Sequence, residues 1–340
     1  MKTLPGILCA GILLQSAAAL AQTASVCPIN AVFLALTNEV RGYPTRANGP
    51  TTPCQIIRGA ATTLTTANSV SVSVNGYLHV LQFLTNGTVT VFPPNAHGNA
   101  APNRIESVLN NDLVAEATDR EVNDFVLSRR DGDAAISVTQ ASTTRAEFAF
   151  VAPGFSVASA MAVDKDDNLV VGGWDPKNNA LVETLGTSSS LGTPAVVGRL
   201  AGPKTQIFPG DIADFNDLGL NTMSIATDPV NGELYVYTYS KADRMQKILV
   251  FRPGATGDVA PIRVLAGSLT QIGPPGTLTN KIAVAADGRL FVAEADNRIL
   301  VFAPGARGDV PPAQIIEDST VGSTQVGAGG IGVRSCSCNQ

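Results

Sequence analysis

Short runs of alternating apolar and polar residues, separated by turns rich in glycine and proline, recur along most of the chain. Ile282–Val284 is followed by an Asp-Gly turn and then by Leu290–Ala293, and Ile225–Thr227 is followed by an Asn-Gly turn and then by Leu234–Tyr237. Alternation with a period of two indicates strands, and an Asx-Gly pair between two such runs indicates a hairpin. The pattern predicts an all-β chain built from short antiparallel hairpins.

A second pattern extends each hairpin into a longer repeat. A strand that ends at an aromatic residue is followed by a Pro/Gly-rich turn, and copies of this motif stand at 43–53, 92–102, 251–261 and 302–312. In all four copies an aliphatic residue follows the aromatic one at an offset of thirteen. A fourth strand is therefore expected after each turn. Each repeat predicts a four-stranded antiparallel meander, which is the unit of a β-propeller blade.

The number of blades follows from the spacing of the aromatic anchors. They stand at Tyr43, Phe92, Phe251 and Phe302, with intervals of 49, 159 and 51 residues. Because the middle interval is about three repeats long, two further blades are expected within it. The first is expected to end a strand near Phe150 and to lack its outer strand, and the second to contain a strand at 181–185. The prediction is six blades.

The two ends of the repeat region complete each other. Gly330–Val333 is predicted as an innermost strand with no hairpin partner after it, and Val32–Leu36 as a second strand with no first strand before it. Pairing them forms one blade from both ends of the chain and removes the open sheet edges that invite aggregation. The expected fold is a single six-bladed β-propeller domain over residues 22–340.

Residues 1–21 have the features of a secretory signal peptide, with a basic Lys2, an apolar run, and Ala19-Leu-Ala21 before Gln22. No later stretch approaches the roughly 20 apolar residues of a transmembrane helix. We therefore expect a secreted or periplasmic protein without an integral membrane segment. Charged residues make up only 15% of the chain and the net charge is −5, which argues against nucleic-acid binding, since that requires clustered Lys and Arg.

Four cysteines follow the signal peptide: Cys27, Cys54, Cys336 and Cys338. An even number of cysteines in an exported protein predicts disulfides. In the expected closing blade all four lie on one face. We predict two disulfides that fasten the ring, with Cys27 bonded to Cys336 or Cys338 and Cys54 bonded to the other. Each is expected to contribute about 2 to 4 kcal/mol.

The units 282–293 and 225–237 resemble the strand-turn-strand signature of NHL-repeat propellers. The motif Phe-x-Pro-Gly-Ala-x-Gly-Asp at Phe251 and Phe302 resembles a variant found in exported bacterial members. The resemblance implies the six-bladed fold. It implies no particular activity, because related propellers include binding modules, lyases and lactonases.

Ligands of propellers usually bind at the axis, near the loops that lead into the innermost strands. We take the residue two positions before Ile282 as the reference and apply the same register to the other blades. This predicts a ring of residues around the axis. Its members are Asn68, Asp124, Ser159, Met223, Asn280 and Gly329. The polar members Asn68, Asp124, Ser159 and Asn280 are candidate ligand-binding residues. The alternative, that they only line a water-filled channel, stays open.

We expect an exported binding or interaction module that acts as a monomer, has no cofactor, and binds a protein, a glycan or a small polar ligand. The alternative is a metal-dependent hydrolase or lactonase in which Asp124, Asn68 and Asn280 hold a divalent cation such as Ca²⁺. The zinc mechanism of the amidating lyase that shares NHL repeats depends on axial histidines. It does not carry over, because His79 aligns with a second strand and His97 with a turn.

Three further features have both a structural and a functional interpretation. Residues 164–168 have the look of a calcium loop, but they align with an ordinary hairpin turn, which we favour. Trp174 ends a predicted second strand, where we favour packing between blades over a contact at the rim. The segment 202–221 interrupts the repeat, and such an insertion either caps the channel or forms a surface loop.

Overall fold

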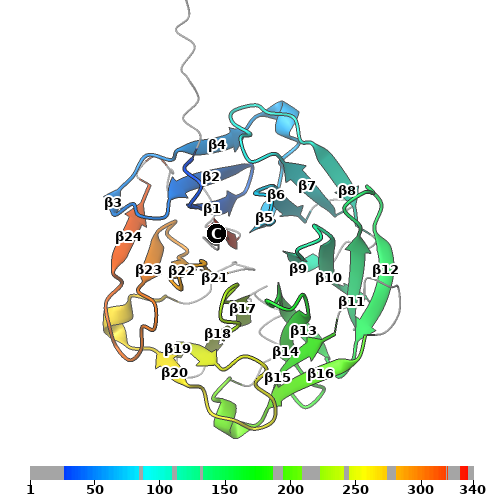
Figure 1. The fold of residues 1–340 in the computed structure, drawn as a ribbon, viewed down its shortest axis with the longest axis vertical. Coiled ribbons are helices and arrows are strands. Elements are labelled where there is room, and N and C mark those ends of the chain that lie inside the picture. The colour runs from blue at the N-terminus through cyan, green and yellow to red at the C-terminus, as the bar shows by residue number, and fades with distance from the viewer. Residues whose placement is uncertain are drawn as a thin grey trace, which may run out of the picture.

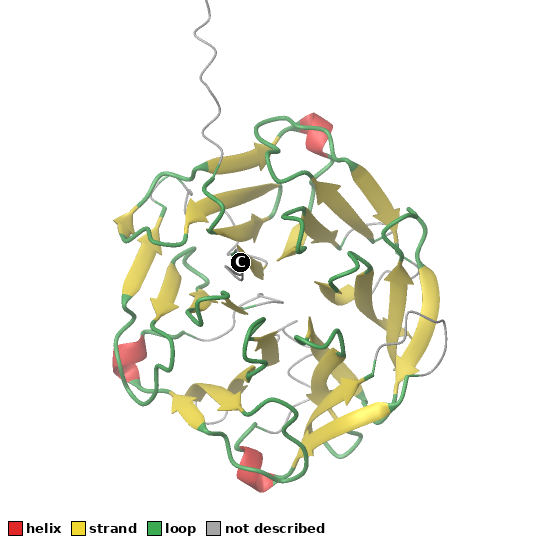
Figure 2. Ribbon diagram, viewed as in Figure 1, coloured by secondary structure: helices red, strands yellow, loops and turns green. Residues whose placement is uncertain are grey.

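The structure, a computed structural model, describes residues 27–83, 87–108, 113–130, 133–186, 194–208, 223–240, 245–273, 281–318, 320 and 330–335. Six antiparallel sheets stand as blades around a central axis, which confirms the predicted six-bladed propeller (Figure 1). Among the described residues, the helical content is limited to three short 3₁₀ turns on the outside of the ring (Figure 2). The predicted all-β class is confirmed.

The blades are numbered along the chain, and each is given from its innermost to its outermost strand. Blade 1 contains β25 (Gly330–Arg334), β1 (Ala31–Leu36), β2 (Glu39–Pro44) and β4 (Gln55–Arg58). Blade 2 contains β5 (Ala67–Val72), β6 (Leu78–Gln82), β7 (Thr88–Phe92) and β8 (Arg104–Ser107). Blade 3 contains β9 (Leu113–Thr118), β10 (Asp124–Arg130), β11 (Asp133–Thr139) and β12 (Glu147–Ala152).

Blade 4 contains β13 (Val157–Val163), β14 (Leu169–Trp174), β15 (Ala180–Leu185) and β16 (Val196–Ala201). Blade 5 contains β17 (Met223–Thr227), β18 (Leu234–Ser240), β19 (Met245–Phe251) and β20 (Arg263–Leu265). Blade 6 contains β21 (Ile282–Val284), β22 (Leu290–Ala293), β23 (Ile299–Phe302) and β24 (Gln314–Glu317), and β3 (Gly49–Pro50) is added in parallel to its outer edge. The 3₁₀ turns are η1 (Ala60–Thr62), η2 (Pro203–Thr205) and η3 (Ser268–Thr270).

Blade 1 is formed by both ends of the chain, as predicted. β25 pairs antiparallel with β1 over five residue pairs, from Ala31 opposite Arg334 to Ala35 opposite Gly330. β25 also lies against β5 of blade 2. A Cβ atom on Gly332 would lie 2.6 Å from the carbonyl oxygen of Val70 in β5, so only glycine allows this close approach.

Blade 3 differs from the prediction, which gave it no outer strand. Phe150 lies on β12, the outermost strand, whereas we expected it to end the third strand. The third strand, β11, ends at Thr139, which lies opposite Asp124 in the same way that Phe92 lies opposite Leu78 in blade 2. Threonine thus replaces the aromatic anchor, and a count based on aromatic residues could not locate this blade correctly.

The repeated turn motif joins each of the four blades that carry it to the blade before. Its glycine at offset six pairs with the outer strand of the preceding blade, as Gly98 does with Ile57 in β4. In three of the four copies an Asp or Asn follows this glycine and accepts a hydrogen bond from a backbone N–H of the preceding 3₁₀ turn. These bonds are Ala61 to Asn99, Lys204 to Asp258 and Leu269 to Asp309, each at 2.7 Å. The motif is therefore a contact between blades.

Hydrophobic clusters fill the interfaces between neighbouring blades. Trp174 is buried in the cluster between blades 4 and 5, and its Nε1 donates to the carbonyl oxygen of Phe208 at 3.3 Å. The packing role predicted for Trp174 is confirmed. The cluster between blades 2 and 3 is the smallest of the six within the described residues. It consists of Leu81, Val89, Val91, Leu113 and Val126.

The disulfide pairing differs from the prediction. Cys27 is bonded to Cys54, with Cα atoms 4.9 Å apart, so the predicted bonds of both residues to the C-terminal cysteines are wrong. Cys336 and Cys338 lie outside the described residues. The backbone N–H of Cys54 donates to the carbonyl oxygen of Gly42, and the sulfur of Cys27 lies beside the same glycine. The chain after β2 thus returns toward the start of β1.

We expect the double substitution Cys27→Ser/Cys54→Ser to lower the free energy of unfolding by about 3 to 4 kcal/mol, because the bond closes a loop with a sequence separation of 27 residues. Urea unfolding measures this change, with Cys336→Ser/Cys338→Ser as the matched control. A peptide map made without reduction tests the pairing directly. A Cys27 peptide linked to Cys336 or Cys338 would contradict it.

A buried ion pair joins blades 6 and 1. Nη1 of Arg41 lies 2.8 Å from Oδ2 of Asp318, and the hydroxyl of Tyr43 donates to the same oxygen at 2.9 Å. Burial alone would raise the pKa of Asp318, but hydrogen bonds from Thr320, Arg41 and Tyr43 outweigh burial and lower this pKa below its usual value. The ionised carboxylate therefore stabilises the junction.

The pKa of Asp318 is lower in the folded chain than in the unfolded chain. The ionised carboxylate therefore stabilises the fold at pH values above the usual carboxyl pKa of about 4, and this stabilisation is lost as the pH falls through the pKa of the folded state. We expect Asp318→Asn to be less stable than the wild type at pH 7, with a difference that shrinks below about pH 4. Urea unfolding as a function of pH measures it, and Asp166→Asn at an exposed turn is the control. A difference independent of pH would contradict this interpretation.

Candidate functional site

A cavity of about 680 Å³ opens at the axis, on the face where the innermost strands end. Its wall is formed by residues at equivalent positions near the ends of the innermost strands. These are Val72, Val163, Thr227, Val284 and Val333. Four of them lie opposite the first residue of a second strand, and Val333 lies opposite the second residue of β1. Its polar rim contains Ser73, Asn75, Asn95, Arg120, Arg334 and Ser335. No carboxylate is present among the described residues that line it.

Two arginines give the cavity a positive charge. The guanidinium of Arg334 donates to the backbone carbonyl oxygens of Ile29 and Pro94 at 3.2 and 3.1 Å, and its burial lowers its pKa, although a guanidinium stays protonated. The side chain of Arg120 is 55% exposed and lies 3.9 Å from the carboxylate of Asp167. Arg120 is therefore the more accessible cation at the rim.

Exposed apolar side chains surround the mouth of the cavity. Ile29 and Val74, which line it, are 64% and 69% exposed, and Val230, next to the lining residue Pro229, is 54% exposed. Apolar surface gathered at a concave site is typical of binding sites. The cavity thus combines an apolar wall, an apolar mouth and positive charge.

The predicted ring belongs to the opposite face, where the innermost strands begin. Asn68 lies on β5 and Ser159 lies on β13, which are the innermost strands of their blades, as predicted. Met223 is the first residue of the innermost strand β17. Asn280 and Gly329 lie outside the described residues. The structure therefore places three ring residues as expected and leaves their role as ligands a prediction.

Asp124 does not belong to this ring. It is the first residue of β10, the second strand of blade 3, and pairs with Thr118, the last residue of β9. Counting four residues back from Thr118 gives Val114 at the ring position, so the ring residue of blade 3 is apolar. The register was wrong by one strand because Thr139 replaces the anchor of this blade.

The ligand set expected for an axial cation is consequently not brought together. Asn68 lies four residues before the end of β5, whereas Asp124 is level with the ends of the innermost strands. At about 3.3 Å per residue, this offset is roughly 13 Å along the strand. Asn68 lies toward the face where the innermost strands begin, and Asp124 lies toward the face where they end.

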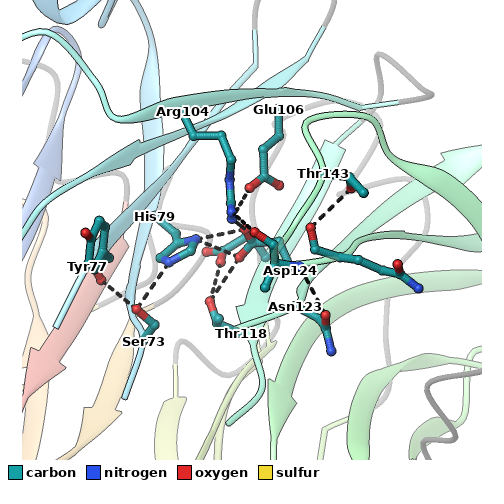
Figure 3. A network of polar contacts seen from close by, with 12 residues as sticks. Ser73, Tyr77, His79, Arg104, Glu106, Thr118, Asn123, Asp124 and Thr143 are labelled. Carbon is teal, nitrogen blue, oxygen red and sulfur yellow. Dashed lines mark hydrogen bonds and ion pairs between the residues drawn. The ribbon is translucent and has the colours of Figure 1, made fainter. Parts of the chain in front are cut away.

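Asp124 instead belongs to a buried polar cluster between blades 2 and 3 (Figure 3). Nδ1 of His79 on β6 lies 2.8 Å from the carboxylate of Asp124. Nη2 of Arg104 on β8 lies 2.5 Å from Oε1 of Glu106 and 3.4 Å from Oδ2 of Asp124. His79, Glu106 and Asp124 are fully buried. Figure 3 shows the three side chains converging from the two blades.

A third carboxyl group, that of Glu116 on β9, adjoins the cluster. Its Oε1 accepts hydrogen bonds from the hydroxyls of Ser71 at 2.6 Å and Thr118 at 3.1 Å. The Thr118 hydroxyl also lies 3.1 Å from Oδ1 of Asp124. Glu116 is only 1% exposed, so both sides of the interface contribute buried carboxyl groups.

Four cluster members occupy positions that carry aliphatic, methionine or aromatic side chains in every other blade. Asp124 corresponds to Val32, Leu78, Leu169, Leu234 and Leu290. Glu116 corresponds to Val70, Met161, Ile225, Ile282 and Ile331. Glu106 corresponds to Ile57, Phe150, Leu200, Leu265 and Ile316. His79 corresponds to Phe33, Phe125, Val170, Tyr235 and Phe291.

Burial and mutual repulsion determine the protonation of the cluster. Burial raises the pKa of Glu106 to about 9, and the neighbouring charge of Asp124 adds to this rise. Burial also raises the pKa of Glu116 well above its usual value. For Asp124, burial acts in the same direction, but hydrogen bonding and attraction by His79 outweigh it and lower the pKa. Asp124 is thus the ionised carboxylate of the group.

The other features singled out in the sequence have structural roles or lie outside the described residues. Oδ1 of Asp164 accepts hydrogen bonds from the backbone N–H groups of Asp166 and Asn168, as expected for a hairpin turn. His97 is exposed in the turn of blade 2. Residues 209–222 lie outside the described part of the chain. Within that part, no helix has the length and apolar character needed to cross a membrane.

No family model matches the sequence, and no curated protein matches it. Solved structures are similar in fold. A chain of a nidogen/laminin complex has a TM-score of 0.56 at 10% identity, over 90% of this chain and 100% of that one. A functionally unknown protein from Desulfotomaculum acetoxidans has a TM-score of 0.53 at 11% identity, over 90% and 85%. Hydrazine synthase of Kuenenia stuttgartiensis has a TM-score of 0.50 at 13% identity, over 81% and 80%. These likenesses concern the fold alone.

Proposed function

We propose that this chain is an exported, NHL-like propeller that acts as a binding module, and that its axial cavity holds a small organic anion with an apolar body. The observation that carries the proposal is the cavity itself, with its apolar wall, two arginines and no carboxylate among the described lining residues. The volume of about 680 Å³ lies within the range of about 300 to 1,000 Å³ that is typical of small-molecule sites.

The rim supports an anionic group on the ligand. A guanidinium pairs well with a carboxylate because its N–H donors match the two oxygens. Nη2 of Arg120 donates to the backbone carbonyl oxygen of Lys165. Its side chain is nevertheless 55% exposed and its contact with Asp167 is long, at 3.9 Å, so N–H donors of the guanidinium remain for this role. Arg334 is held by backbone carbonyl groups and contributes positive charge from a fixed position. The valines of the wall would accommodate the apolar body.

Export is supported by two independent features. Residues 1–21 have the charge, apolar run and small-residue site of a signal peptide. The Cys27–Cys54 disulfide is typical of proteins that fold in an oxidising compartment. The resemblance of residues 225–237 and 282–293 to NHL repeats supports the NHL-like assignment.

Decanoate is a suitable probe because it joins an apolar chain to a carboxylate. We expect decanoate to bind the wild type by isothermal titration calorimetry. Arg120→Ala is expected to weaken binding about tenfold, which corresponds to the loss of one charged hydrogen bond. Val163→Trp, which fills the cavity, is expected to weaken it at least as much.

Arg252→Ala is the matched control, since Arg252 is exposed in the turn of blade 5 and does not line the cavity. Decylamine, with the same chain and a positive charge, is the control ligand. Equal affinity of decanoate for the wild type and Val163→Trp, or equal affinity of decylamine and decanoate for the wild type, would contradict the proposal.

A further inference from the structure

The interface between blades 2 and 3 contains titratable side chains where the other interfaces contain apolar ones. At four equivalent positions the other five blades carry aliphatic, methionine or aromatic side chains, whereas this interface carries His79, Glu106, Glu116 and Asp124. Burying charged groups costs free energy that a well-packed apolar core avoids. Such a cluster at one interface of a repeated fold indicates a function that the other interfaces do not share.

Three of these side chains have the geometry of a metal site. One ligand atom each of His79, Glu106 and Asp124 can be chosen so that all three lie within 4.8 Å of one another. In a tetrahedral zinc site with bonds of about 2.0 to 2.1 Å, the ligand atoms are about 3.3 Å apart. From the upper bound of 4.8 Å, each pair of ligand atoms would have to approach by at most about 1.5 Å to reach this spacing. The three residues come from β6, β8 and β10, so an ion would join two blades.

Two carboxyl oxygens of the cluster have no hydrogen-bond partner among the described residues: Oε2 of Glu106 and Oε2 of Glu116. Both side chains are almost completely inaccessible to solvent, with residue exposures of 0% and 1%. The carboxyl group of Glu106 points toward Asp124 and His79 (Figure 3). A buried polar atom without a partner is rare in proteins, and a bound ion is one of its established explanations.

The charges of the cluster favour a divalent cation. Metal ligands bind in their deprotonated form, so a bound ion would take the place of the proton that burial favours on Glu106. With Glu106, Glu116 and Asp124 all deprotonated around the ion, His79 neutral and Arg104 positive, the net charge is −2, which one divalent ion neutralises. An imidazole nitrogen together with carboxylate oxygens is a donor set that suits zinc and neighbouring transition metals. Arg104 remains available to Glu106 from its partly exposed position, with a side-chain exposure of 15%.

We propose that His79, Glu106 and Asp124 bind one divalent transition-metal ion, with Zn²⁺ as the representative, between blades 2 and 3. Glu116 lies beside the ion and contributes negative charge. The site goes beyond the binding function proposed above and does not depend on it, since none of the three ligands lines the axial cavity. An ion held by two blades stabilises the folded ring, because it binds the folded chain and not the separated blades.

The test uses the chelator-treated mature chain, titrated with ZnCl₂ by isothermal calorimetry and followed by thermal unfolding. We expect one Zn²⁺ per chain and a rise in the unfolding temperature. His79→Phe, which introduces the residue found at this position in blades 1, 3 and 6, is expected to weaken zinc binding by more than the roughly 10- to 100-fold caused by changes outside the ligand set.

The chain contains two histidines, so His97→Ala provides a matched control, and it is expected to retain one Zn²⁺ per chain. The triple variant His79→Phe/Glu106→Leu/Asp124→Leu restores the apolar residues of the other blades, and it is expected to fold with an unfolding temperature that zinc does not change. Absence of stoichiometric zinc binding to the wild type, or binding that survives His79→Phe and is lost in His97→Ala, would overturn the proposal.

Discussion

The pairing of β25 with β1 is the constraint on which the rest of the ring depends. Each blade packs against two neighbours, one on each face of its sheet. If blade 1 lacked β25, the inner edge of β1 would be open and β5 would lose the strand that lies against it. An open edge of this kind is a site for association with other chains. Closure therefore protects all six interfaces.

The repeated turn motif makes the spacing between blades regular. Each Gly-Asx pair contacts the outer strand and the 3₁₀ turn of the preceding blade, as Gly308 and Asp309 do with Leu265 and Leu269. A Cβ atom on Gly267 would lie 2.2 Å from the carboxyl carbon of Asp309, so this contact requires a glycine at position 267. The motif that reveals the repeat in the sequence is thus the one that holds neighbouring blades together.

The sequence allowed the fold to be predicted where the repeat is regular. The aromatic anchors and Asx-Gly turns located four blades and the closure, because each residue type in them is required by a turn or by packing between blades. The prediction failed in blade 3, where Thr139 replaces the anchor, and this one change placed Asp124 on the axis. The disulfide was mispredicted because the order of strands does not specify how the chain after β2 returns toward Cys27.

The two candidate sites also differ in how far the repeat pattern could predict them. The cavity is formed by residues at the ends of innermost strands, and the register that groups positions 68, 159 and 280 also groups Val72, Val163 and Val284, four residues later. The polar cluster was hidden because its members come from four strands of two blades. If blade 3 had been aligned in the correct register, the signal would have been a Glu or Asp at positions where the other blades carry aliphatic residues, Met or Phe. Side-chain distances such as the 2.8 Å between His79 and Asp124 required the structure.

Native-state hydrogen exchange of the backbone amides in β25 and β1 tests ring closure most directly. If the ring is closed by this pair of strands, the hydrogen-bonded amides of residues 331–333 and 32–35 exchange only through global unfolding, with the same free energy as the central strands of the other blades. Rapid exchange of residues 331–333 through local opening, while β1 and β2 stay protected, would contradict the account, because β25 would then be a frayed end and not a structural part of blade 1.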